Sequence, residues 1–319
     1  MKNIIQKILL VVRTRGVISL VRASLRIALR VFLLNILKKR YVNTAVFDFK
    51  LRIDLKDKGI SRTLWLYGER ELDHKWMLEE VVWPGARILD VGANIGYYAV
   101  MESLLVGEKG QILALEPSPE NYRTLEKNIL LNRAENVSLE CVAVSNKTEQ
   151  KTFFLAEESN LNTFYEPILA KRGNLAGSVL VQTYSLSDII AKYGSFDFLR
   201  MDIEGHEVFV LEEIATLAKA GKKCPSIIFE SHINAYGPDQ DIKPVLTALE
   251  DCGFHVSIVA SSNERGTEKL IRMGHEPVRT IVTDETVRTI HRDLQFSELI
   301  ECITNTGGIR TIFLQAPVA

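Results

Sequence analysis

A glycine-rich turn with an acid in front of it is the strongest chemical signal in the sequence. Residues 88–98 read ILDVGANIGYY, which predicts an apolar strand, a turn at Gly92 and Gly96, and a helix behind the turn. The glycines are spaced G-x-x-x-G, whereas a dinucleotide-binding fold carries G-x-G-x-x-G. Asn94 stands between them, and asparagine tolerates the left-handed backbone of a tight turn. The turn is therefore a candidate ligand loop, with free N–H groups at the start of the helix.

Two acids indicate which ligand this turn suits. Asp90 ends the first strand, where a carboxylate repels a pyrophosphate and attracts an ammonium group. Glu116 ends the next strand and can accept hydrogen bonds from both hydroxyl groups of a ribose. S-adenosylmethionine (SAM) carries an ammonium group, a sulfonium group and a ribose, so the sequence favours SAM over NAD. The predicted SAM contacts are Asp90, Gly92, Asn94, Gly96 and Glu116, with Ala143 as a backbone contact to the adenine.

Three more ionisable side chains follow two later strands. Asp202 ends the fourth predicted strand, and Glu230 and His232 follow the fifth. Because the carboxyl ends of parallel strands meet at one edge of a sheet, we expect these residues to share a site. Asp202 is the predicted general base or metal ligand, and Glu230 and His232 orient the acceptor, move the proton or complete a divalent metal site. Glu207 is interpreted as a first-turn helix acid favoured by the helix dipole.

A regular alternation of strands and helices from Arg87 onward predicts the parallel α/β sheet that positions these residues. The predicted strands are 87–91, 111–115, 137–144, 196–201, 225–230, 254–260 and 309–315. The predicted helices are 71–82, 95–105, 118–132, 206–219, 241–252 and 284–303. A hairpin of 151–155 with 178–184 interrupts the series, and residues 44–54 predict a strand or hairpin that leads into the domain.

The N-terminal segment differs from the rest of the chain in its charge. Residues 1–40 hold ten Lys or Arg residues and no acid, whereas the remaining chain holds 29 basic and 40 acidic residues, a net charge of −11. The pattern predicts a helical arm with a break near Gly16, in which Arg22, Arg26 and Arg30 share a face. Apolar residues recur at steps of three and four on the neighbouring face. Three roles stay open: a helix packed on the domain, an organelle presequence, or an in-plane membrane anchor.

Composition and cysteine usage narrow the class further. With 46% hydrophobic and 25% charged residues, the chain is typical of a globular protein. Its longest stretch without a charged residue, 173–187, is too short and too polar to span a membrane. The four cysteines form no CxxC pair, which predicts a reducing, cytoplasmic setting without disulfides. The basic residues gather in the arm, away from the predicted cleft, so nucleic acid is not an expected partner.

Together these motifs resemble the FkbM family of SAM-dependent methyltransferases. The resemblance is carried by Asp90-VGANIGYY, Leu115-Glu116-Pro117, Arg200-Met-Asp202-Ile-Glu204-Gly-His-Glu207, Glu230-Ser-His232 and the lead-in Tyr67-Gly68-Glu69. It departs from the family pattern at Arg200, where lysine is common, and at Ser231, where an aliphatic residue is common. The resemblance implies a class I methyltransferase (Rossmann-like) α/β fold of about seven strands with the last antiparallel. It also implies O-methylation of a hydroxyl group in a sugar, glycan, glycolipid or polyketide-like product.

The predicted organisation is a helical arm at 1–43 and a methyltransferase domain at 44–319, divided into a lead-in at 44–85 and a core at 86–319. Two alternatives stay open. A non-catalytic SAM-binding scaffold would leave Asp202, Glu230 and His232 without a task, and a nucleotide-dependent oxidoreductase is disfavoured by the glycine spacing. The expected partner is a small-molecule or glycan acceptor. The expected location is the cytoplasm, with residues 1–40 as a candidate peripheral contact to the cytoplasmic membrane face.

Overall fold

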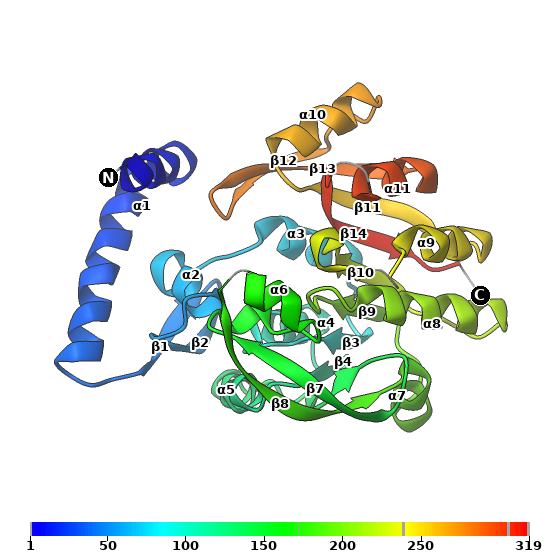
Figure 1. Cartoon of the computed structure of the whole chain (residues 1–319), viewed down its shortest axis with the longest axis horizontal. Coiled ribbons are helices and arrows are strands. Elements are labelled where there is room, and N and C mark those ends of the chain that lie inside the picture. Colours follow the sequence, from blue (N-terminus) through cyan, green and yellow to red (C-terminus); the bar gives the residue numbers. More distant parts are fainter. Residues whose placement is uncertain (1, 172, 238–239, 305–306, 318–319) are drawn as a thin grey trace.

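A computed structural model of the chain has a mixed nine-stranded sheet at its centre (Figure 1). The structure describes residues 2–171, 173–237, 240–304 and 307–317. The strand order is β12-β13-β11-β14-β10-β9-β3-β4-β5. Of the seven strands from β11 to β5, six run in one direction and β14 runs in the opposite direction. This confirms the predicted class I methyltransferase sheet. The seven strands are β3 (Arg87–Val91), β4 (Gln111–Leu115), β5 (Val137–Glu140), β9 (Phe198–Met201), β10 (Ser226–Glu230), β11 (His255–Ser261) and β14 (Ile309–Gln315).

Helices cover both faces of this sheet, because its strands are apolar on both sides. Ile88 and Leu89 are neighbours in β3, are both fully buried, and belong to two different hydrophobic cores. Strand side chains alternate between faces, so a strand covered on both sides must be apolar throughout. One core lies under α4 and α5, and the other under α7, α8, α9 and α11. The helices are α4 (Tyr97–Val106), α5 (Pro119–Asn132), α7 (Leu186–Tyr193), α8 (Glu207–Lys219), α9 (Ile242–Asp251), α10 (Glu264–Arg272) and α11 (Phe296–Thr304).

The lead-in is a hairpin followed by two helices; the hairpin at 44–54 and the helix at 71–82 were predicted, whereas α2 was not. Its elements are β1 (Tyr41–Val46), β2 (Phe49–Asp54), α2 (Ile60–Tyr67) and α3 (Leu72–Val81). The arm before it is α1 (Lys2–Asn35), which breaks at Gly16 (φ 79°, ψ 169°) as expected. In Figure 1, α1 stands at the edge of the molecule next to α2 and the β1–β2 hairpin. β1 begins at Tyr41, two residues before the predicted boundary between the arm and the domain at residue 43. That boundary stays a prediction.

A second, three-stranded sheet is inserted between β5 and α7. It contains β6 (Ala143–Val144), β7 (Glu149–Ala156) and β8 (Leu175–Tyr184), together with the short helices η1 (Ser159–Leu161) and α6 (Glu166–Lys171). The predicted hairpin of 151–155 with 178–184 is confirmed, because β7 and β8 pair antiparallel. The strand predicted at 137–144 is wrong as one element, since the chain leaves the main sheet after Glu140 and re-enters strand structure in the other sheet. We call residues 145–184 the insertion.

The helix predicted at 284–303 is wrong over its first half. Residues 279–294 form a hairpin of β12 (Arg279–Thr283) and β13 (Thr286–Leu294), which adds two strands to the sheet, and α11 begins only at Phe296. The two hairpin residues, Asp284 and Glu285, both have positive φ without being glycine. A two-residue turn with both φ values positive normally carries Asn-Gly or Asp-Gly. The sequence therefore lacked the usual turn signal.

Candidate active site

Four parallel strands bring the predicted site residues to one edge of the sheet. The strands lie in the order β10-β9-β3-β4 and run in the same direction. Asp90 lies at the end of β3 and Glu230 ends β10, while Glu116 and Asp202 directly follow β4 and β9. Ligands of open α/β sheets bind outside the carboxyl ends of their strands. The four acids therefore share the expected edge, and their individual roles stay predictions.

A cavity opens at this edge, where ligands of such sheets bind. One wall contains predicted residues, namely Gly92, Asn94, Glu116, Ala143 and Asp202. The facing wall comes from the insertion and contains Phe153, Ser159, Asn160, Asn162 and Phe164. No pattern in the sequence indicated this second wall, and of the predicted SAM contacts Asp90 and Gly96 are not among the lining residues.

The glycine turn has the predicted shape, but contacts within the protein explain its two glycines. A Cβ on Gly92 would lie 2.4 Å from the Asp202 carbonyl oxygen, and a Cβ on Gly96 would lie 2.7 Å from Leu125. Gly92, Asn94 and Gly96 all have positive φ, at 81°, 51° and 88°. Contacts within the protein therefore require the two glycines, whereas the sequence interpretation assigned them to the close approach of a ligand.

The backbone N–H groups of this turn are already paired inside the protein. The N–H groups of Gly92 and Ala93 donate to the Leu115 carbonyl at 2.9 and 3.0 Å, and that of Gly96 donates to the Ala93 carbonyl at 2.8 Å. The N–H of Asn94 donates to Oε2 of Glu116 at 2.8 Å. The expectation that free N–H groups face the ligand is therefore wrong for these residues. The polar groups of the cavity are therefore side chains, including the carboxylate of Glu116.

Glu116 links the turn to the ligand cavity. Its Oε1 accepts hydrogen bonds from the Ser118 N–H at 2.8 Å and from Nδ2 of Asn121 at 3.4 Å, while its Oε2 holds the Asn94 N–H. The carboxylate lines the cavity and is 4% exposed. Burial raises the pKa of Glu116 to about 7, although the N–H groups of Ser118 and Asn94 act in the opposite direction. Oε2 keeps a lone pair for a ligand hydroxyl group.

We expect SAM binding to weaken as the pH falls through 7. Glu116 accepts hydrogen bonds from ribose hydroxyls only as a carboxylate, and its pKa of about 7 leaves mostly the protonated form at pH 6. If the carboxylate form alone binds, the dissociation constant should be about tenfold higher at pH 6 than at pH 8. Isothermal titration with SAM at both pH values measures this difference. Glu116→Gln should bind about 10–100-fold more weakly at pH 8 and lose the pH dependence. A pH dependence that persists in that variant would assign it to another group.

Asp90 is not open to the cavity. Its side chain is fully buried, and Oδ1 accepts a hydrogen bond from Nη1 of Arg200 at 3.1 Å. Arg200 also stacks on the ring of Tyr98, with its Cζ 4.0 Å from the ring centroid, and reaches Asp202 at 3.4 Å. The buried carboxylate therefore has a guanidinium partner where the sequence interpretation expected the ammonium group of SAM. Its role as a SAM contact stays a prediction.

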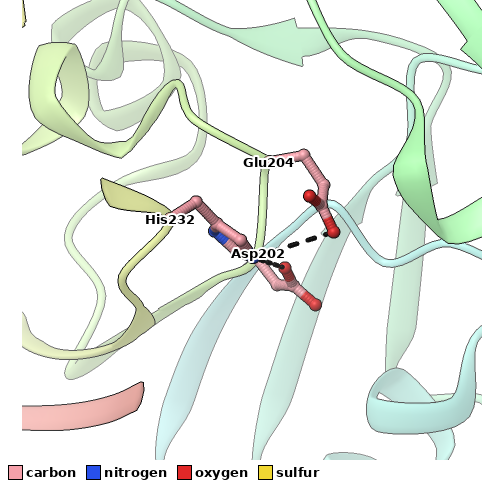
Figure 2. Close-up of side chains that lie close together, drawn as sticks. All are labelled: Asp202, Glu204 and His232. Atoms are coloured by element: carbon pink, nitrogen blue, oxygen red, sulfur yellow. Dashed lines mark ion pairs between the residues drawn. The ribbon is translucent and has the colours of Figure 1, made fainter. Parts of the chain in front are cut away.

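Asp202, Glu204 and His232 converge beside the cavity (Figure 2). Nε2 of His232 lies 3.6 Å from Oδ1 of Asp202 and 3.7 Å from Oε1 of Glu204. The two acids come from the loop after β9, and the histidine comes from the loop after β10. Both acids line the cavity, although the sequence prediction named only Asp202. Burial raises the pKa of Glu204 to about 7, and burial together with the charge of Glu230 raises the pKa of Asp202.

Glu207 holds His232 in place, which corrects its interpretation as a helix acid alone. Oε1 of Glu207 lies 2.7 Å from Nδ1 of His232, and its side chain is fully buried. An imidazole that donates from Nδ1 presents Nε2 to the two cavity acids. Burial alone would lower the pKa of His232, but the carboxylates of Glu204 and Glu207 outweigh it and raise the pKa well above its usual range. The surrounding carboxylates therefore favour the protonated imidazole.

Glu230 lies behind this cluster. It is 2% exposed, pairs with Arg310 at 2.8 Å and reaches Nε2 of His232 at 3.8 Å, and it is not among the cavity-lining residues. Burial would raise the pKa of Glu230, but Arg310 and the two neighbouring histidines outweigh it and lower the pKa well below its usual value. Glu230 thus lies next to His232 and outside the cavity lining, and its predicted roles, to orient the acceptor, move the proton or complete a metal site, stay predictions.

The same cluster has the donor atoms of a divalent cation site. Among the residues that the structure describes, Asp202, Glu204 and His232 offer ligand atoms that all lie within 4.8 Å of one another. Glu204 thus takes the place that the sequence prediction gave to Glu230. Two carboxylates and an imidazole whose second nitrogen is held by a carboxylate form a common metal-binding arrangement. Whether the reaction uses a metal stays a prediction.

Glu207→Gln should lower turnover by about 10–100-fold, because the hydrogen bond that orients the imidazole then loses its charge. Removing that carboxylate should also lower the pKa of His232, since Glu207 raises it. An NMR titration of the histidine ring measures the pKa, and steady-state kinetics measures the turnover. Glu212→Gln, on an exposed position of the same helix α8, is the matched control. Unchanged values for both quantities in Glu207→Gln would remove Glu207 from the site.

Comparison with known proteins agrees with this geometry. Residues 90–256 match the family model of the methyltransferase FkbM domain. Methyltransferase sdnD of Sordaria araneosa is 29% identical over 199 residues, which cover 53% of this chain and 74% of sdnD. The protein-L-isoaspartate O-methyltransferase of Caenorhabditis elegans is 26% identical over 126 residues, which cover 40% of this chain and 51% of that protein.

Solved structures with a similar arrangement are more distant in sequence. A SAM-dependent O-methyltransferase of Thermotoga maritima shows a TM-score of 0.39 and 12% identity, with 88% of each chain covered. Fibrillarin of Aeropyrum pernix, solved with natively bound SAM, shows a TM-score of 0.35 and 13% identity, with 76% of this chain and 74% of fibrillarin covered. The fold assignment rests on the strand order itself. With its matching family model, the glycine turn and the acids after β4 and β9, the chain belongs to the FkbM family of SAM-dependent methyltransferases.

Proposed function

We propose that the chain transfers the methyl group of SAM to a hydroxyl oxygen of a sugar, glycan, glycolipid or polyketide-like acceptor. One observation supports this most directly. Asp202 and Glu204 open onto the same cavity as Glu116, so that two carboxylates with raised pKa values lie beside the predicted ribose contact. A hydroxyl group has a very high pKa and needs a proton acceptor before it can attack a methyl group.

The cavity offers polar groups that suit SAM. The side chains of Asn94, Asn121 and Asn162 line it together with Glu116. Amide groups can pair with ligand hydroxyl, amino or ring nitrogen groups. The sulfonium of bound SAM supplies an already activated methyl group. The task of the chain is then to hold the acceptor oxygen in line with that methyl group and to take up one proton.

Asp202 is the proposed proton acceptor. The acceptor oxygen forms a bond to the methyl carbon as the bond from that carbon to sulfur breaks, and the hydroxyl proton passes to the carboxylate of Asp202. Burial raises the pKa of Asp202, so that its carboxylate is a stronger base than an exposed one. The His232 cation keeps Asp202 and Glu204 together despite their like charges. Glu207 and Glu230 fix the imidazole from two other sides.

A divalent cation on Asp202, Glu204 and His232 is the alternative way to acidify the hydroxyl group. The two routes differ in one measurable respect. If the cation route operates, EDTA abolishes activity, and Mg²⁺ or Mn²⁺ restores it. Full activity in EDTA assigns the proton to the carboxylate alone.

A methyl-transfer assay on the full-length chain tests the proposal. The acceptors are simple glycosides, polyketide alcohols and a glycolipid extract from a strain that lacks the protein, and mass spectrometry detects a gain of one methyl group. Isothermal titration with SAM and with NAD separates a methyltransferase from a nucleotide-dependent oxidoreductase. SAM binding without transfer to any acceptor would favour the scaffold alternative, and methylation of a nitrogen or carbon atom would contradict the O-methyl assignment.

A further inference from the structure

Arg15, Arg26 and Arg30 of the arm contact the body of the protein, whereas Arg22, which was predicted to share a face with Arg26 and Arg30, is exposed. Arg15 pairs with Glu69 at 2.6 Å and lies 4.3 Å from the ring centroid of Tyr67. Arg26 donates to the Trp65 carbonyl, and Nε1 of Trp65 donates back to the Arg26 carbonyl at 2.8 Å. Of the three open roles, the packed helix and the in-plane membrane anchor would therefore use two different faces of α1.

Arg30 completes this attachment. Its Nε donates to the Leu55 carbonyl at 2.6 Å. Two residues further along the chain, Oδ1 of Asp57 accepts the N–H of Ser159 at 3.0 Å, and the Ser159 carbonyl accepts Nδ2 of Asn94 at 3.0 Å. Polar contacts thus run from the arm through the lead-in to the wall of the SAM cavity. Whatever binds the arm is held close to the active site.

The neighbouring face of the arm is apolar and exposed. We call it the apolar stripe, and its members recur at steps of three and four residues: Ile18, Val21, Leu25, Leu29, Phe32 and Ile36. They are between 45% and 71% exposed, with Ile18 at 71% and both Leu25 and Ile36 at 67%. A contiguous exposed apolar surface of this kind marks an interaction site. The fold leaves it open because Arg15, Arg26 and Arg30 occupy the inner face.

Cations lie beside the apolar stripe. Arg22 on α1 and Lys38 and Lys39 after it are exposed and have no acidic partner among the described residues. The first carboxylate of the chain is Asp48. A second copy of the chain, docked stripe to stripe, would bring these cations together without acids from the arm to offset them. An anionic lipid surface instead complements both the cations and the apolar residues.

No helix among the described residues is both long and apolar enough to cross a bilayer. The arm therefore fits the interface plane, with the stripe in the acyl region and the cations at the headgroups. We propose that the apolar stripe docks the protein on an anionic membrane surface.

Side chains of the arm are described from Val11 onward, so Lys2 and Lys7, two of its ten predicted cations, lie outside the described side chains. The proposal does not depend on the identity of the methyl acceptor.

Vesicle co-sedimentation of the full-length chain tests this proposal. The probes are phosphatidylcholine vesicles with and without phosphatidylglycerol, at low and high salt. The stripe variant, Ile18→Ser with Leu25→Ser and Phe32→Ser, should bind anionic vesicles at least tenfold more weakly than wild type. The cation variant, Arg22→Gln with Lys38→Gln and Lys39→Gln, should lose about fivefold for each charge that engages the bilayer, and lose the salt dependence.

Matched controls separate lipid docking from general effects. Leu130→Ser removes an apolar side chain that is 78% exposed on α5 and should leave vesicle binding unchanged. Thermal melting should be alike for all variants, since the replaced side chains are exposed. Vesicle binding that is equal in wild type and the stripe variant overturns the proposal. A second outcome also overturns it: light scattering shows a dimer for wild type and a monomer for the stripe variant, while the two bind vesicles equally. The stripe would then bind a second copy of the chain.

Discussion

Replacing Asp202 with asparagine should lower the rate of methyl transfer by about 10²–10⁴-fold, the usual contribution of a positioned acid or base. Asparagine keeps the size of the side chain and its place 3.6 Å from His232, but it cannot take up the acceptor proton. SAM affinity should change little, because the predicted ribose contact is Glu116. Single-turnover kinetics at saturating SAM measures the transfer step, and isothermal titration measures the affinity.

The control for this experiment is Glu126→Gln, which neutralises an exposed carboxylate on α5. It should leave both the rate and the affinity unchanged. Wild-type turnover in Asp202→Asn would remove Asp202 from both the base and the metal roles. A rate loss in Asp202→Asn that follows a proportional loss of SAM affinity would make Asp202 a cofactor contact instead.

Asp90→Ala should lower the free energy of unfolding by about 3–5 kcal/mol, the cost of breaking a buried ion pair by removing one partner. Arg200 is 2% exposed and would lose its contact with Asp90, leaving the more distant Asp202 as its acidic partner at 3.4 Å. Urea unfolding followed by circular dichroism measures the change. The sequence interpretation predicts a loss of SAM affinity of about 10–100-fold for the same variant.

A double variant distinguishes these two results. Asp90→Leu combined with Arg200→Met removes both charges, and well-packed apolar pairs often replace buried ion pairs at little cost. Its stability should therefore exceed that of Asp90→Ala. If Asp90→Ala unfolds like wild type and binds SAM more weakly, Asp90 is a ligand contact and its pairing with Arg200 contributes little.

The central parts of the strands were predictable because a strand that is buried on both faces is a continuous run of apolar residues, with turn residues before and after it. The bounds of β3, β4 and β14 agree with the prediction residue for residue. The edge hairpin β12–β13 was missed because Arg288 and His291 lie inside it, and charged residues normally argue against a buried strand. The structure satisfies them internally: Arg288 donates to Asp73 at 2.8 Å, and His291 lies 2.7 Å from Oγ1 of Thr289.

The site was predictable where chemistry follows from strand ends and unpredictable where it depends on side-chain partners. Asp202 and Glu116 were found because each follows a strand. Glu207 was misread because an acid in the first turn of a helix is common for a purely electrostatic reason. Its hydrogen bond to His232 joins residues 25 positions apart, and no local pattern reports such a pair. The arm was predicted correctly as a helix with a break near Gly16, but which face meets the protein depends on carbonyl acceptors in the lead-in.

The insertion has a consequence for the surroundings of both substrates. It supplies the second wall of the cavity, yet it pairs only within its own three-stranded sheet and leaves the order of the main sheet unchanged. Glu116 and Asp202 are anchored in the main sheet, on the other wall. The order of the main sheet therefore does not depend on the length of residues 145–184. Because Ser159 and Asn162 of the insertion line the same cavity as Glu116, a change in this one module would alter the surroundings of the methyl donor as well as those of the acceptor.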